Sequence, residues 1–323
     1  MALQDTLKRF GEQFDWDPVI ENGNSLSAHA RYIVCGMGGS NLGTWLLKHF
    51  GPTTNLMFHR EYGLPIIAQS AYEDALIILS SYSGTTEETL DSARVALERG
   101  LPMAAISTGG KLIEFAKEHG LPYIQIPDTG LEPRMAIGFS MIGIARLMQH
   151  TALEKDIRVA GKSVDPMSGE QEGKRIAATL VDKIPVIYSS SVNLPIAYIW
   201  KIKFNETAKI PAFCNSFPEL CHNELTGFDV YTKTREISKS IQIIFLDDVA
   251  DHPRNQKRMK IASDMLGERG IAVEHSQLEG GGFVKAFSSA LLADWVSLTL
   301  ADHYGVPNPE TPMVAEFKHR IEL

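Results

Sequence analysis

The segment that most constrains the fold is a short apolar run that ends in a string of hydroxyl side chains. Residues 75–79 read Ala-Leu-Ile-Ile-Leu, a continuous run that is typical of a strand buried on both faces of a parallel sheet. Residues 80–89, here called the hydroxyl loop, read Ser-Ser-Tyr-Ser-Gly-Thr-Thr-Glu-Glu-Thr, and apolar residues then recur at helical spacing. A strand that leads through a polar turn into a helix is the repeating unit of α/β folds.

The hydroxyl loop is suited to binding an anion. Where a strand ends and a helix begins, unpaired backbone N–H groups and the positive end of the helix dipole favour negative charge. Gly84 lets the backbone approach a ligand closely. The alternative is a simple capping box made by Thr85 and Glu88, but one cap needs only one hydroxyl. We therefore predict a phosphate site whose neutral donors are Ser81, Ser83, Thr85 and Thr86.

The same alternation of strands and helices extends along the chain. Its strand-like segments in the first half are residues 31–35, 55–59, 75–80, 102–107 and 123–126. The pattern returns at residues 183–189, 241–247 and 270–276, after a polar region at 150–180. We therefore predict an α/β protein with two doubly wound parallel-sheet subdomains related by an internal repeat. The predicted domains are residues 1–154, with an amino-terminal helix, and residues 155–323, with a carboxyl-terminal helical segment. Only the first copy contains the hydroxyl loop.

Composition excludes several classes of protein. The formal charge of -8 argues against nucleic acid or an anionic membrane as the main partner, because either favours a basic surface. The three cysteines, Cys35, Cys214 and Cys221, form no CxxC pair, and their odd number argues against a disulfide framework, so we expect a cytoplasmic protein. We expect no apolar stretch that approaches the roughly 18 residues of a membrane helix, and the amino terminus lacks a signal-peptide core.

A glycine-rich turn follows the first predicted strand. It reads Gly-Met-Gly-Gly-Ser from Gly36 and opens a helix, so we expect Gly38, Gly39 and Ser40 to share the phosphate with the hydroxyl loop. The alternative is a dinucleotide fingerprint, but the third glycine of that motif would fall on Asn41, and a lone fingerprint is a weak signal.

Three segments offer groups for acid–base chemistry. Arg134, in a Glu-Pro-Arg string, can stabilise a developing oxyanion, although a surface ion pair with Glu132 is the alternative. Glu206 has a lysine three residues before it and another three residues after it, so a solvated ion-pair face competes with a catalytic role. His222 lies among polar residues, which suits acid–base chemistry better than a core position. The histidines show no metal-binding spacing, so we expect no metal.

These segments together resemble the bifunctional phosphoglucose/phosphomannose isomerase family, whose members contain two sugar isomerase (SIS) domains of flavodoxin-like topology. The resemblance covers nearly the whole chain, and its motifs occur in the order of the family. They are GMGGS at 36–40, SYSGTTEET at 81–89, EPR at 132–134, FNETAKIP at 204–211, ELCHNE at 219–224 and TPMVAEFK at 311–318.

The resemblance implies an aldose–ketose isomerisation that converts glucose 6-phosphate or mannose 6-phosphate to fructose 6-phosphate through a cis-enediol, without a cofactor. It implies that Glu206 is the base, that Arg134 stabilises the enediolate and that His222 and Lys318 assist ring opening. Thr311 would line the pocket. It also implies a homodimer in which His222 acts in trans. The residues it assigns to the phosphate are Ser40, Ser81, Ser83 and Thr86.

Two other functions are compatible with parts of the sequence. SIS domains also occur in regulators, so a non-catalytic sugar-phosphate sensor would keep the hydroxyl loop and dispense with Glu206. Such a regulator usually has an appended DNA-binding or partner domain, and the sequence shows none. An NAD-dependent enzyme would use the glycine turn at Gly36 instead.

Overall fold

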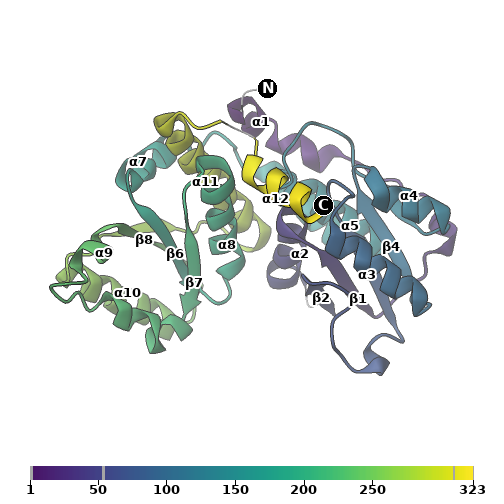
Figure 1. Ribbon diagram of the computed structural model, residues 1–323, viewed down its shortest axis with the longest axis horizontal. Helices are drawn as coiled ribbons and strands as arrows, with labels where there is room; N and C mark the ends of the chain where they lie inside the picture. The colour runs from purple at the N-terminus through teal and green to yellow at the C-terminus, as the bar shows by residue number, and fades with distance from the viewer. Residues whose placement is uncertain (1–2, 53–54, 308–309, 323) are drawn as a thin grey trace. The chain divides into compact units, whose positions relative to one another are not determined.

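The computed structural model describes residues 3–52, 55–307 and 310–322, and its chain divides into two compact units (Figure 1). The first unit comprises residues 9–164. The second unit combines the amino-terminal segment through Lys8 with the chain from Asp165 onward. The sequence-based boundary at residue 154 falls inside helix α6 (Thr151–Ser163), and helix α1 (Leu3–Lys8) groups with the second unit.

The first unit is built on a five-stranded sheet in the order β2-β1-β3-β4-β5, and every pair of neighbouring strands is parallel. This is the doubly wound order of flavodoxin-like folds. Its strands are β1 (Arg31–Gly36), β2 (Leu56–His59), β3 (Ala75–Ser80), β4 (Met103–Ser107) and β5 (Tyr123–Gln125). Its other helices are α2 (Gly38–Phe50), α3 (Glu87–Glu98), α4 (Gly110–Glu118) and α5 (Ile137–Leu147).

The second unit has a four-stranded parallel sheet in the order β7-β6-β8-β9, which matches the order of the first four strands of the first sheet. The predicted internal repeat is thus confirmed in topology. The strands are β6 (Ile184–Ser190), β7 (Phe213–Phe217), β8 (Ile241–Asp247) and β9 (Val273–Gln277). The helices are α7 (Glu170–Leu180), α8 (Leu194–Lys203), α9 (Arg235–Lys239), α10 (Pro253–Glu268), α11 (Gly282–Tyr304) and α12 (Pro312–Glu322).

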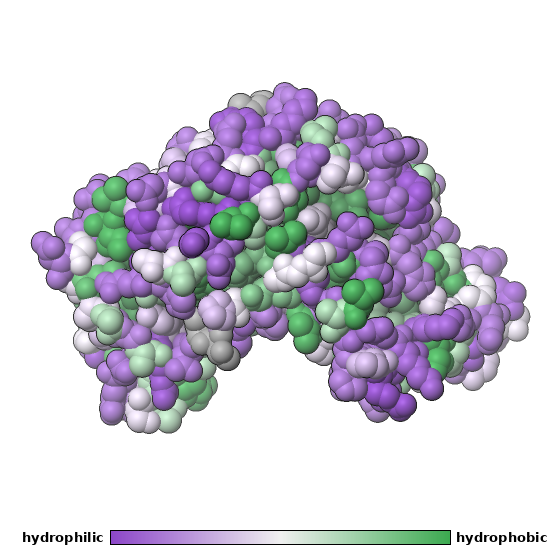
Figure 2. All heavy atoms as spheres, turned by 180° about the vertical axis from the view of Figure 1, so that it is seen from behind, coloured by the Kyte–Doolittle hydropathy of each residue, from purple (hydrophilic) through white to green (hydrophobic). Residues whose placement is uncertain are grey.

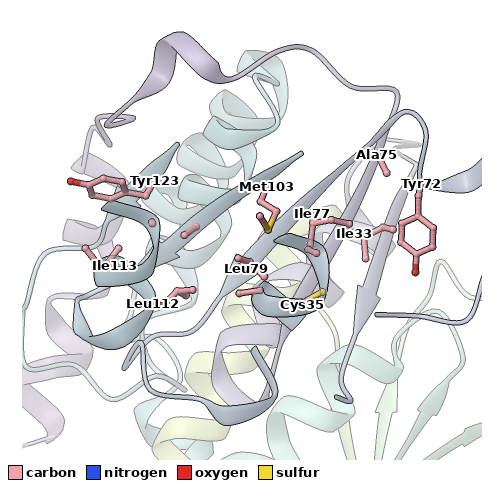
Figure 3. Packing of buried hydrophobic residues seen from close by; sticks show 14 residues of the cluster. Ile33, Cys35, Tyr72, Ala75, Ile77, Leu79, Met103, Leu112, Ile113 and Tyr123 are labelled. Carbon is pink, nitrogen blue, oxygen red and sulfur yellow. The ribbon is translucent and has the colours of Figure 1, made fainter. Parts of the chain in front are cut away.

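The core of the first unit lies between the central strands and the helices that cover one face of the sheet. Every residue of β3 is buried, as the continuous apolar run predicts. Figure 3 shows Ile77 and Leu79 of this strand with Ile33 of β1 and Leu112 of α4 in one cluster. Cys35 belongs to the same cluster, and burial raises the pKa of its thiol to about 12. This packing fixes the end of β3, where the hydroxyl loop begins.

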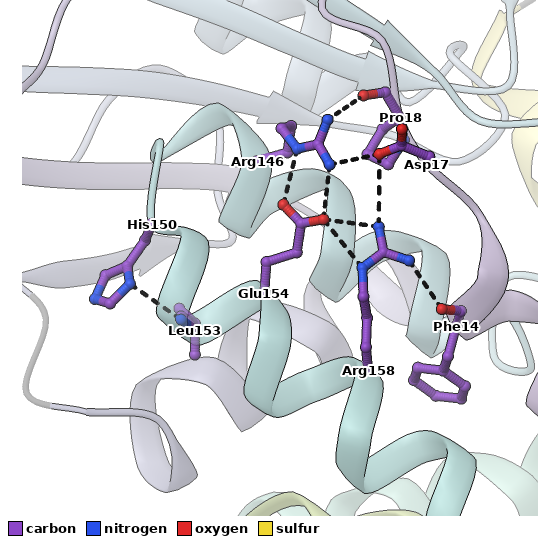
Figure 4. A network of polar contacts seen from close by, with 8 residues as sticks. All are labelled: Phe14, Asp17, Pro18, Arg146, His150, Leu153, Glu154 and Arg158. Carbon is purple, nitrogen blue, oxygen red and sulfur yellow. Dashed lines mark hydrogen bonds and ion pairs between the residues drawn. The ribbon is translucent and has the colours of Figure 1, made fainter.

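An ion-pair network around the buried Glu154 joins α5 and α6 to the start of the first unit (Figure 4). The Glu154 carboxylate accepts hydrogen bonds from Arg146 Nε at 2.8 Å and from Arg158 Nη2 at 2.7 Å, and Arg146 also reaches Asp17 at 2.6 Å. The hydrogen bond from Arg146 is the main cause that lowers the pKa of Glu154. The network holds the helices behind the sheet in a fixed arrangement.

Helix α11 corrects the expectation that the chain contains no apolar stretch of membrane-helix length. It is 23 residues long and passes a test for a possible membrane span by length and composition. However, 78% of its apolar window is buried inside the protein, and its buried residues include Lys285 and Asp294. It is the core helix of the second unit, with α7 and α8 packed against it.

Hydrophilic residues cover most of the molecular face seen in Figure 2.

Candidate functional site

Three loops of the first unit pack against one another beyond the carboxyl ends of β1 and β3. A Cβ atom at Gly36 would lie 2.6 Å from the carbonyl oxygen of Ser80, so only glycine allows this approach to the end of β3. A Cβ atom at Gly39 would lie 2.8 Å from Pro133 and 2.9 Å from the backbone nitrogen of Arg134. The glycine turn therefore contacts both the hydroxyl loop and the Glu-Pro-Arg segment, although both segments are distant from it in sequence.

Ser40 connects the glycine turn to the hydroxyl loop by hydrogen bonds. Its Oγ accepts the backbone N–H of Tyr82 at 2.8 Å, and its carbonyl oxygen accepts the hydroxyl of Ser80 at 3.3 Å. The structure thus places Ser40 beside the loop with which it was predicted to act. That the two loops share one phosphate stays a prediction.

Within the hydroxyl loop the side chains are arranged in pairs. Ser81 is buried, its Oγ lies 2.8 Å from Oγ1 of Thr86, and it accepts the N–H of Gly84 at 3.0 Å. Ser83 is exposed, with its Oγ 3.0 Å from Oγ1 of Thr85. Ser81 therefore shapes the turn, while Ser83 faces solvent.

The capping-box alternative does not account for this loop. Helix α3 begins after Thr86, not Thr85, and the Thr86 side chain makes no capping hydrogen bond. The first turn of α3 also contains Glu87 and Glu88, so the phosphate would depend on the loop donors more than on the helix dipole alone.

We expect Gly84→Ala to damage the hydroxyl loop severely. Gly84 has a φ of +70°, and a Cβ atom there would overlap the carbonyl oxygen of Gly109. Gly100→Ala is the matched control, because Gly100 has a φ of +62° but nothing near its Cβ position. In thermal unfolding, Gly100→Ala should cost about 1–2 kcal/mol, and Gly84→Ala clearly more. Equal losses would show that the close approach to Gly109 does not matter.

Arg134 is completely buried, so it is not the surface arginine of the alternative interpretation. Its Nη1 lies 3.5 Å from the carboxylate of Glu132, which is the partner that this alternative named. The backbone of Arg134 thus lies beside the glycine turn, and the charge of its buried guanidinium is partly compensated by Glu132. A buried, oriented guanidinium interacts strongly with a developing negative charge.

Glu206 lies in an unusual local structure. Helix α8 ends at Lys203, and the chain continues in a single π-helical turn, Phe204–Ala208, closed by Lys209 in the left-handed conformation with φ +59°. Such turns occur frequently at functional sites. Glu206 itself is partly exposed. Lys203 does not belong to a solvated ion-pair face, because its ammonium is buried 2.6 Å from the carboxylate of Asp294.

His222 ends a short 3-10 helix, Glu219–His222, and its side chain is exposed, as expected for a residue outside the core. The segment is held by Glu224, whose carboxylate accepts hydrogen bonds from Tyr188 Oη on β6 and from Asn215 Nδ2 on β7. Burial and the Glu224 carboxylate both raise the pKa of Tyr188. Sequence reasoning missed this anchor, although Glu224 is part of the motif that contains His222.

The two remaining predicted residues are Thr311, directly before α12, and Lys318 within this helix. The carbonyl oxygen of Thr311 accepts the N–H of Val314 at 3.1 Å, so Thr311 stands at the start of the helix. Lys318 is exposed on the same helix. The first unit thus contains Gly38, Gly39, Ser40, Ser81, Ser83, Thr86 and Arg134, and the second unit contains Glu206, His222, Thr311 and Lys318.

Comparison with known proteins decides the family. The bifunctional phosphoglucose/phosphomannose isomerase of Aquifex aeolicus is 30% identical over 98% of this chain and 97% of its own. The enzyme of that name from Caldicellulosiruptor bescii is 35% identical over 88% of this chain and 86% of its own. The chain belongs to the bifunctional phosphoglucose/phosphomannose isomerase family. The model of the bacterial phospho-glucose isomerase C-terminal SIS domain matches residues 169–321 of this family member.

Other similar proteins mark the breadth of the relationship. A D-glucosamine-6-phosphate 4-epimerase of Sulfolobus acidocaldarius is 29% identical over 77% of this chain and 79% of its own. A hypothetical protein from Thermus thermophilus has a similar fold, with a TM-score of 0.72, 15% identity and coverage of 99% of this chain and 87% of its own. The C-terminal domain of glucosamine-fructose-6-phosphate aminotransferase from Francisella tularensis gives a TM-score of 0.64 at 14% identity, over 95% and 97%. These structures show the fold alone.

In this family member, the carboxyl ends of β6 and β8 correspond to those of β1 and β3 in the first sheet. Charged side chains of the protein itself occupy these ends of the second sheet. Ser190, at the end of β6, donates to Asp251 Oδ1 at 2.6 Å, and Asn193 donates to Asp248 Oδ2 at 2.9 Å. Lys285 makes an ion pair with Asp248, and all five residues are buried. Burial raises the pKa of Asp251, against the opposing effect of the Ser190 hydrogen bond. Carboxylates thus lie where the first copy presents hydroxyls.

Over residues 3–52, 55–307 and 310–322, the structure forms no group of three or more histidine, cysteine, aspartate or glutamate side chains that could hold a metal ion.

Proposed function

We propose that this protein interconverts glucose 6-phosphate and mannose 6-phosphate with fructose 6-phosphate through a cis-enediol(ate) intermediate. The observation that carries this proposal is the similarity, over nearly the full length of both chains, to enzymes named for both activities. The hydroxyl loop, joined to Ser40 and to the Arg134 segment, supports a phosphorylated substrate. The three cysteines of this protein are free, which supports the reducing cytoplasm as its location.

In the proposed mechanism the two ends of the substrate have different partners. Hydroxyl and backbone N–H groups of Ser40 and residues 81–86 hold the phosphate. These donors are neutral, so they add no positive charge near the reacting carbons. Glu206 removes the proton from C2 of the aldose and returns it to C1, while a hydroxyl proton moves from O2 to O1, which gives the ketose. Arg134 stabilises the negative oxygen of the enediolate. No cofactor takes part, because the oxidation of one carbon balances the reduction of its neighbour.

Ring opening precedes this proton transfer. His222 and Lys318 are proposed to assist ring opening. One group must take the proton of the anomeric hydroxyl, and the other must supply a proton to the ring oxygen. Thr311 would line the pocket. We further propose a homodimer in which the partner subunit's His222 serves the site. Exposed apolar side chains on α12 support self-association, among them Met313 at 84% and Phe317 at 63% exposure.

A coupled assay tests the proposed function. The purified protein is supplied with glucose 6-phosphate, mannose 6-phosphate or glucosamine 6-phosphate, each with and without a chelator. We expect turnover of the first two and no effect of the chelator. Turnover of glucosamine 6-phosphate alone would favour an epimerase like the Sulfolobus relative, and no turnover with tight binding would favour a sensor. Loss of activity with the chelator would contradict the proposed metal-free mechanism.

A further inference from the structure

A second constellation of reactive side chains lies in the second unit, among residues to which the isomerase reaction assigns no role. His275 on β9 is hydrogen-bonded through both ring nitrogens. Its Nδ1 lies 2.6 Å from Oδ2 of Asp247, at the end of β8, and its Nε2 lies 2.9 Å from Oγ of Ser263 on α10. A hydroxyl, an imidazole and a carboxylate joined in this order, through these atoms, form the arrangement that activates a serine nucleophile.

The three side chains are accessible. They line a cavity of about 260 Å³, together with residues that include Lys260 and Gln277. The side chains of His275 and Asp247 are 46% and 30% exposed, and Ser263 is partly exposed. A small reagent can therefore reach Oγ of Ser263 without any rearrangement of the core.

We propose that Ser263 is an activated nucleophile that accepts acyl groups from small activated carboxylic esters. Oγ of Ser263 forms a bond to the carbonyl carbon, and the bond from that carbon to the leaving oxygen breaks. The hydroxyl proton passes to Nε2 of His275 and then to the departing alcohol or phenol. Asp247 accepts the hydrogen bond from Nδ1 and stabilises the transient imidazolium. Hydrolysis of the acyl-serine by water, again through His275, restores the hydroxyl.

The surroundings of Ser263 define the kind of ester. Lys260 lies three residues before Ser263 on α10, hence on the same face of the helix, and its ammonium lies 3.6 Å from a carboxylate oxygen of Asp264. Asp247 and Asp264 also line the cavity and disfavour an anionic acyl group. The size of the cavity and these charges together favour a short, uncharged acyl group such as acetyl.

The geometry also predicts the pH dependence of acylation. The hydrogen bond that His275 donates to the Asp247 carboxylate is the main cause that raises the pKa of His275, and only the neutral ring can accept the proton of Ser263. Acylation should therefore increase with pH and reach half its maximum above about 6.5, the ordinary histidine value. The charged groups around the ring are Asp247, Asp248, Lys260, Asp264 and Glu274.

The experiment treats the full-length protein with 4-nitrophenyl acetate and, separately, with a fluorophosphonate probe, and locates the adduct by mass spectrometry. We expect one adduct, on Ser263, absent from Ser263→Ala. Ser288→Ala, which removes a partly exposed helical serine of the second unit, should react like the wild type. His275→Asn and Asp247→Asn should each slow acylation by about 10²-fold or more.

Melting temperatures and isomerase turnover of all four variants show whether each is folded. Adducts mainly on other residues, equal reaction of Ser263→Ala, or an unchanged rate in folded His275→Asn would each overturn the proposal.

Discussion

Glu206→Gln should lower the turnover of fructose 6-phosphate by about 10²- to 10⁴-fold, the usual contribution of a positioned general base. The amide keeps the size of the side chain but cannot accept the proton that must leave C1 of the ketose. Because the proposed phosphate donors belong to residues 40 and 81–86, KM should change little. A second readout is direct: exchange of the transferred hydrogen with deuterated solvent should disappear in the same proportion as turnover.

Glu268→Gln is the matched control for this variant. Glu268 is an exposed glutamate at the end of α10, and its replacement removes the same charge far along the chain from the π-helical turn. It should leave turnover and exchange unchanged. Full activity of Glu206→Gln would remove Glu206 from the mechanism, and equal losses in both variants would indicate a general effect of net charge.

Asp294→Ala should destabilise the protein by about 3–5 kcal/mol, the range found when one partner of a buried ion pair is removed. Lys203 and Asp294 are 1% and 4% exposed, so the ammonium loses its carboxylate in a place that water does not reach. Lys203 directly precedes the π-helical turn Phe204–Ala208. We therefore expect the isomerase activity of the remaining folded protein to fall as well, because the position of Glu206 depends on that turn.

Glu170→Ala provides the contrast for chemical denaturation. It breaks the pair between Lys174 and Glu170, whose side chains are 57% and 36% exposed, and should cost less than about 1 kcal/mol. A double variant, Lys203→Met with Asp294→Leu, should recover most of the stability that Asp294→Ala loses. Failure of Asp294→Ala to exceed the Glu170→Ala loss would show that the buried pair contributes little.

The sequence predicts the bounds of strands most accurately where both faces are buried. Residues 75–80 and 241–247 are mostly apolar, and the structure confirms both as β3 and β8 with the same bounds. Strand β7 was not recognised, because Phe213–Phe217 is an edge strand with polar residues in its middle and partial exposure. Its pattern therefore lacks the apolar continuity on which the other predictions depend.

The site shows a similar division. Spacing along the chain identified the hydroxyl loop, the glycine turn and the charged candidates, since each is a local string. Whether a charge is buried depends on residues distant in sequence, so a surface position of Arg134 remained an alternative. Lys203 was for the same reason interpreted as a neighbour of Glu206, whereas its carboxylate partner is 91 residues away. The π-helical turn at Glu206 was also not predicted from the sequence.

The carboxylates at the strand ends of the second sheet have a thermodynamic consequence. Asp251 is covalently tethered beside Ser190, so the second copy of the fold always has its anion at saturating effective concentration. Under the proposed function, the first copy has no such internal anion and must bind the phosphate of a dissolved sugar phosphate instead. Mass action then makes the free energy of unfolding of the first unit a function of sugar-phosphate concentration, with a gain of about 2.7 kcal/mol at one hundred times the dissociation constant. Under the proposed function, one of two halves with a shared topology contains its own anion, and the other gains stability from the substrate that it binds.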